Sequence, residues 1–98
     1  MTTIPSVEVP YGDTTLSLAV GATQSKIISG AFGGLVAAWQ AVTGMDLVAC
    51  TKIIALGSDK SVAEIETTVF EGGLYVLTAP LDRYLNLLAS GGREDVAA

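Results

Sequence analysis

The chain has 98 residues, half of them hydrophobic, and its ten acidic and five basic side chains give a net charge of −5. This length predicts one domain over residues 1–98, and the few scattered basic residues exclude a surface built to neutralise nucleic acid or an anionic membrane. The chain has no histidine and one cysteine, so it lacks the usual general base and the commonest metal ligand; we expect no enzyme, no cofactor and no metal site.

The N-terminal part predicts a β-hairpin over residues 6–20, preceded by a flexible arm, residues 1–5. Apolar and polar residues alternate on both sides of a turn that contains Pro10 and Gly12, which is typical of strands with one buried face. The apolar positions are Val7, Val9, Leu16, Leu18 and Val20. Because a lone hairpin is barely stable in water, we expect this face to pack on helices.

The next stretch predicts one helix that ends at Gly44, with Thr23 or Ser25 as its cap. One face of this helix carries apolar residues at helical spacing: Ile28, Phe32, Leu35, Trp39 and Val42. Three glycines interrupt the pattern: Gly30, Gly33 and Gly34. Each costs about 1 kcal/mol inside a helix relative to alanine. They indicate either close backbone packing or a helix that begins later, near Phe32.

An uncharged run over residues 27–45 has about the length of a membrane span. Its four glycines and Gln40 favour a buried amphipathic helix instead, so we expect a soluble protein.

The run from Leu47 to Leu56 is too short for its period to separate a buried helix from a buried strand. Its β-branched residues favour a strand. Asp46 before the run and Gly57 after it favour a helix, which is our prediction, followed by a loop over residues 57–60. Cys50 lies in this apolar run without a neighbouring base, so we expect an unreactive thiol in the core.

Two helices are predicted over residues 61–92. Ser61 and Glu64 form a capping box at the start of the first, whose apolar side extends to Val76 unless two glycines end it earlier. These glycines are Gly72 and Gly73. The second helix is predicted to begin at Thr78, with Pro80 in its first turn. Two glycines, Gly91 and Gly92, stop it before a short flexible tail, residues 93–98.

These elements predict an α+β fold in which an N-terminal β-hairpin packs on three to four α-helices. The expected partner-binding residues lie on apolar helix faces, where aromatic side chains often dominate binding: Trp39, Leu81, Tyr84, Leu85 and Leu88. Two alternatives remain open for the last helix. Its apolar face either binds a partner or forms core that the helix of Trp39 covers.

Four short motifs, taken in order, resemble the small tail assembly chaperones of long-tailed phages, and most closely the form carried by gene transfer agents. The motifs are residues 12–18 (GDTTLSL), 39–44 (WQAVTG), 69–74 (VFEGGL) and 77–82 (LTAPLD). The likeness covers residues 7–92. One departure is clear, because family members commonly carry a run of acidic residues in the first helix, where this chain reads FGGLVAA over residues 32–38.

The resemblance implies a non-enzymatic protein of the bacterial host cytoplasm. Such chaperones bind the tape-measure protein, keep its long apolar helices soluble and help the tail-tube protein to assemble around it; a homo-oligomer is compatible with this role. The alternative is a structural part of the particle, such as a head–tail connector or tail terminator, which forms rings. Neither nucleic acid nor a membrane is expected as a partner.

Overall fold

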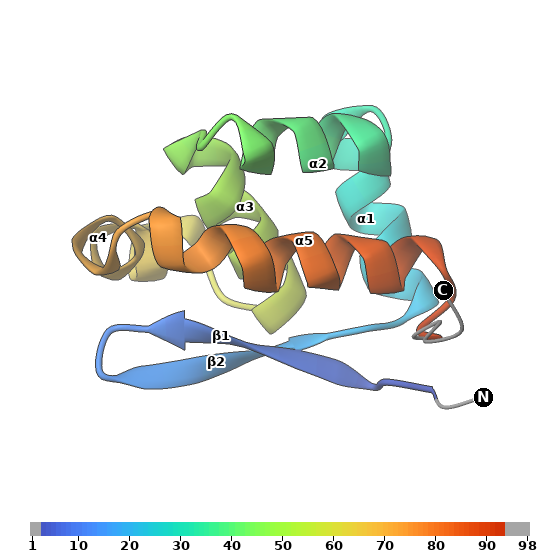
Figure 1. The fold of residues 1–98 in the computed structure, drawn as a ribbon, viewed down its shortest axis with the longest axis horizontal. Helices are drawn as coiled ribbons and strands as arrows, with labels where there is room; N and C mark the ends of the chain where they lie inside the picture. Colours follow the sequence, from blue (N-terminus) through green and yellow to red (C-terminus); the bar gives the residue numbers. More distant parts are fainter. Residues whose placement is uncertain (1–2, 94–98) are drawn as a thin grey trace.

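A two-stranded antiparallel hairpin lies along one side of five helices in the computed structural model, which describes residues 3–93 (Figure 1). The elements are β1 (Ser6–Tyr11), β2 (Thr14–Ala19), α1 (Ala22–Phe32), α2 (Leu35–Thr43), α3 (Leu47–Ser58), α4 (Val62–Gly72) and α5 (Tyr75–Ala89). The predicted α+β class is confirmed. The structure has one helix more than the largest predicted number because the first predicted helix is divided in two.

The hairpin has the predicted turn and register. Tyr11 pairs with Thr14 across the turn, where Gly12 has a φ of 61° that favours glycine. Two cross-strand pairs then share the inner face: Val7 with Leu18, and Val9 with Leu16. Val7, Val9 and Leu18 are buried, while Leu16 and Val20 are half-buried at the edge of the core. The inner face packs on α5 and α3, as the alternation of apolar residues predicts.

The single helix predicted up to Gly44 is wrong, because α1 and α2 are separate helices. The alternative of a helix that begins later, near Phe32, is closer to the structure, in which α2 begins at Leu35. The chain turns between the two helices at Gly33 and Gly34, whose φ values of 78° and 126° are unfavourable for other residues. No described atom lies within 4 Å of a Cβ placed at either position, so backbone conformation rather than close packing requires these glycines. The expected cap is also wrong: α1 begins after Gly21 without a side-chain cap, and Ser25 instead donates to the carbonyl of Leu88.

The run that follows Asp46 is a helix, as predicted. The Asp46 carboxylate accepts a hydrogen bond from the backbone N–H of Ala49 at 3.1 Å and so caps α3. The loop expected over residues 57–60 begins later than predicted, because α3 continues through Gly57 and ends where Asp59 takes a φ of 60°. Helix α3 packs against β2, α1, α2 and α4.

The capping box at the start of α4 is confirmed. Glu64 accepts a hydrogen bond from the backbone N–H of Ser61, and Ser61 accepts one from the backbone N–H of Glu64. Helix α4 ends at Gly72, and Gly73 has a φ of 85°. The start predicted at Thr78 is wrong, because α5 begins three residues earlier, at Tyr75, with Leu74 between this glycine and the helix.

Pro80 therefore lies in the second turn of α5 rather than in the first. It has no N–H to bond with the carbonyl of Val76, one turn earlier. Val76 lies at the surface, where water can hydrogen-bond that carbonyl. This exposure makes the proline compatible with a continuous helix.

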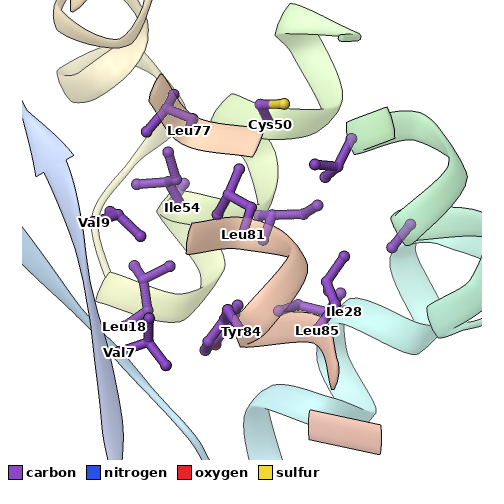
Figure 2. Close-up of a cluster of buried hydrophobic side chains, with 14 of the residues drawn as sticks. Val7, Val9, Leu18, Ile28, Cys50, Ile54, Leu77, Leu81, Tyr84 and Leu85 are labelled. Atoms are coloured by element: carbon purple, nitrogen blue, oxygen red, sulfur yellow. The ribbon is translucent and has the colours of Figure 1, made fainter. Parts of the chain in front are cut away.

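The core lies between the hairpin, α3 and α5, with Tyr84 near its centre (Figure 2). In Figure 2, Leu18 and Val7 approach Tyr84 from the hairpin, and Leu81 and Ile54 lie above it. The Tyr84 hydroxyl donates a hydrogen bond to the carbonyl of Ala19 at 2.8 Å, so this buried polar group is satisfied. Burial raises the pKa of Tyr84, which keeps the hydroxyl protonated.

The two ends of the described chain pair with each other. The backbone N–H of Ile4 donates to the carbonyl of Gly92 at 2.7 Å, and Thr3 and Arg93 form an isolated β-bridge. Residues 3–5 of the expected flexible arm, and Arg93 of the expected tail, are therefore held in place. The rest of both predicted flexible segments, residues 1–2 and 94–98, lies outside the described residues.

Candidate functional site

An apolar groove runs between α2 and the second half of α5. It has a volume of about 280 Å³ and is lined by Leu35, Val36, Trp39, Leu85, Asn86 and Ala89. We call it the α2 groove. The α2 side of the groove belongs to the uncharged run of residues 27–45, which carries four large exposed hydrophobic side chains: Ile27, Val36, Trp39 and Met45. An exposed apolar surface of this kind can bind another apolar surface.

Trp39 is held in a defined orientation at the edge of this groove. Its indole N–H donates a hydrogen bond to Oδ1 of Asp82 on α5. The polar end of the side chain is therefore satisfied, while 42% of its surface remains accessible. Val36, one turn earlier on α2, is 67% exposed, and Leu85 is buried beneath them. An oriented, partly exposed tryptophan beside an exposed valine is a typical anchor of a protein interface.

The structure brings together only two of the five predicted partner-binding residues, Trp39 and Leu85. Leu81, Tyr84 and Leu88 are buried in the core with Leu85. The apolar face of the last helix was predicted either to bind a partner or to form core. In the structure this face is core, and α2 covers part of it. The reason is that α5 is central, with β1 on one side and α2 on the other.

Several exposed apolar residues were not predicted to be at the surface. Val36 belongs to the uncharged run of residues 27–45, and this run was the sequence feature that could have indicated an apolar surface. Phe70, Tyr75 and Val76 are 67%, 83% and 52% exposed at the corner between α4 and α5. The sequence interpretation placed Phe70 and Val76 along a helix that continues past Gly73. The corner at that glycine changes the direction of the chain and leaves these side chains outside.

Within residues 3–93, no group of three or more acidic, cysteine or histidine side chains is placed to hold a metal ion. A cavity of about 580 Å³ between the start of α1 and the end of α5 has Lys26 as its one ionisable lining residue. Cys50 is buried in the core, and burial, with a smaller effect of the Asp46 carboxylate, raises the pKa of its thiol.

We expect Cys50 to react with a thiol reagent such as Ellman's reagent only when the domain opens. The thiolate is the reactive form, and both burial and the raised pKa suppress it. Labelling in native buffer should be on the order of a hundredfold slower than in denaturant, because it requires local unfolding. Labelling at equal rates in both conditions would show that the thiol is exposed.

None of the described helices is both long enough and apolar enough to cross a membrane. No known protein family, curated protein or solved structure matches this chain.

Proposed function

We propose that this protein is a tail assembly chaperone of a phage or phage-like particle of the gene transfer agent type. It binds apolar helical segments of the tape-measure protein in the host cytoplasm and aids assembly of the tail-tube protein around them. The observation that carries the proposal is the α2 groove, where Trp39 and Val36 are exposed and no lining residue is charged. The motifs that resemble the family agree with this role.

The size of the groove sets how the client is held. Helix α2 has nine residues and is therefore about 14 Å long. It can cover about two to three turns of a client helix, with Trp39 and Val36 packed against the apolar stripe, as in other helix-in-groove complexes. A long tape-measure helix thus binds several copies of the chain along its length, each at a separate apolar segment.

Val36→Glu is expected to abolish this holding activity. Val36 is exposed, and an acidic residue is favourable in the first turn of a helix, so the domain stays folded. Losing the burial of one valine, and placing a charge against an apolar client, weakens binding by about tenfold or more. The measurement is the soluble fraction of the tape-measure protein from the same gene cluster, co-expressed with wild-type or variant chain.

Val76→Glu is the matched control, because Val76 is also an exposed second residue of a helix but lies outside the α2 groove. It should keep the client soluble as the wild type does. Equal loss in both variants would contradict a site at α2. If the wild type never improves the solubility of the client and instead forms rings with tail or capsid subunits, the protein is a structural component such as a connector or terminator.

A further inference from the structure

A second apolar surface lies at the end of the molecule that is opposite the paired ends of the described chain, Ile4 and Gly92. Figure 1 shows the hairpin turn, α4 and the start of α5 together at this end. Three large apolar side chains are exposed within seven residues of sequence: Phe70, Tyr75 and Val76. We call this region the α4–α5 corner, and it shares no lining residue with the α2 groove.

The corner contains a small cavity bounded by the hairpin turn. Its volume is about 240 Å³, and it is lined by Pro10, Gly12, Thr68, Val69, Gly72, Gly73, Val76 and Leu77. The hairpin turn and α4 are in close contact here, because a Cβ at Gly12 would lie 3.3 Å from Cγ2 of Thr68. The lining is mostly apolar or glycine, so the cavity suits one large apolar side chain, with Tyr75 and Phe70 exposed close by in the sequence.

The elements that form this corner carry acidic side chains and no basic one in the hairpin, in α4 or in the first half of α5. Residues 3–25, which include the hairpin, contain Glu8 and Asp13 but neither lysine nor arginine. Residues 61–82, which include α4 and the first half of α5, contain four acidic side chains and again no basic one. Three of these, Glu64, Glu66 and Glu71, lie on α4, whereas Asp82 accepts the hydrogen bond of Trp39 at the edge of the α2 groove. The basic side chains nearest in sequence are Lys60 and Arg83, at the two boundaries of this segment.

We infer that the α4–α5 corner is a docking surface for a protein segment that presents a large apolar side chain flanked by lysine or arginine. The cavity and the exposed apolar side chains supply the contact area, and the acidic residues around them select a basic partner by charge complementarity. Acidic or uncharged segments gain no such attraction. The inference goes beyond the holding of an uncharged apolar client, because it assigns a second partner of different chemistry to a separate surface.

The test uses the full chain and a synthetic amphipathic peptide of leucine and lysine as the probe. A peptide of the same pattern, with glutamate in place of lysine, is the control. In a ¹H–¹⁵N NMR titration, the lysine peptide should shift the amide signals of residues 11–13 and 66–77. Val76→Lys should weaken its binding by about tenfold, since it removes an apolar contact and adds a repelling charge. Glu66→Gln with Glu71→Gln should weaken it by about threefold and reduce its dependence on salt.

Val48→Lys is the matched control, because it makes the same change at the exposed second residue of α3, outside both the corner and the α2 groove, and it should leave peptide binding at the corner unchanged. Equal binding of the glutamate peptide would overturn the inference, as would shifts confined to the α2 groove. Self-association that Val76→Lys abolishes would show that a second copy occupies the corner instead. Failure of the tape-measure experiment would leave these outcomes unaffected, since that experiment depends on Val36.

Discussion

Replacing Tyr84 by alanine is expected to bring the domain close to unfolding. The side chain is fully buried between the hairpin and α5, and its hydroxyl donates to the carbonyl of Ala19. Removing a buried aromatic ring costs about 3–5 kcal/mol, whereas a domain of this size has a free energy of unfolding of about 5–15 kcal/mol. Urea denaturation followed by the fluorescence of Trp39, the one tryptophan, measures the loss.

Tyr84→Phe separates the hydrogen bond from the packing. It keeps the ring but leaves the carbonyl of Ala19 without its side-chain donor, so we expect a loss of about 1 kcal/mol. Similar losses from Tyr84→Ala and Tyr84→Phe would mean that the ring contributes little and that the core is arranged differently. A folded Tyr84→Ala variant that fails only in client binding would place the partner site on α5 after all.

Gly57→Ala is expected to destabilise the domain although alanine favours helices. A Cβ at this position, inside α3, would lie 2.7 Å from Oη of Tyr84 and 3.2 Å from Cβ of Leu18. The tyrosine is fixed by its hydrogen bond and by the surrounding core, so it cannot move away easily. The clash exceeds the gain in helix propensity, and we expect a net loss of about 2 kcal/mol in the free energy of unfolding.

Gly30→Ala is the matched control for this substitution. Gly30 also lies inside a helix, but no described atom is within 4 Å of a Cβ placed there, so alanine should stabilise α1 by up to about 1 kcal/mol. The double variant Gly57→Ala, Tyr84→Phe should recover part of the loss, because the nearest clashing atom is gone. Stabilisation by Gly57→Ala alone would show that α3 and α5 are not packed as closely as described.

Local signals were sufficient for much of the fold. The alternation of apolar residues predicted the inner face of the hairpin, and the side chains of Asp46 and Ser61 predicted the starts of α3 and α4. Each of these signals acts over a few residues, through a turn, a backbone hydrogen bond or the two-residue period of a strand. Such interactions form whatever the distant parts of the chain do.

Glycine shows where local reasoning failed. Gly33 and Gly34 separate two helices, and both have positive φ. Gly57 instead lies inside a helix, where the side chain of Tyr84 occupies the space that a Cβ would need. The sequence around each glycine does not distinguish these cases. The outcome depends on a tyrosine 27 positions further along the chain, which only the tertiary structure brings into contact.

Only Trp39 and Leu85 of the predicted partner-binding residues line the α2 groove, because the tertiary structure also decides which helix faces are covered. The helical period groups Leu81, Tyr84, Leu85 and Leu88 on one face but does not show whether that face meets solvent or another element. Helix α5 is packed on both sides, by β1 and by α2, so these residues became core. Trp39 lies on a helix with a single packed side, and its ring remains accessible at the edge of the contact with α5.

The pairing of Ile4 with Gly92 anchors both ends of the described chain at one point of the surface. A polypeptide joined to either end would start from the same place, with the α4–α5 corner at the far end of a molecule 37 Å long. A fully extended linker of about eleven residues is the shortest that spans this length. With a shorter linker, a fused polypeptide cannot reach the α4–α5 corner, which stays open to other partners. With a longer linker, the fused polypeptide can bind the corner within the same molecule and compete with those partners.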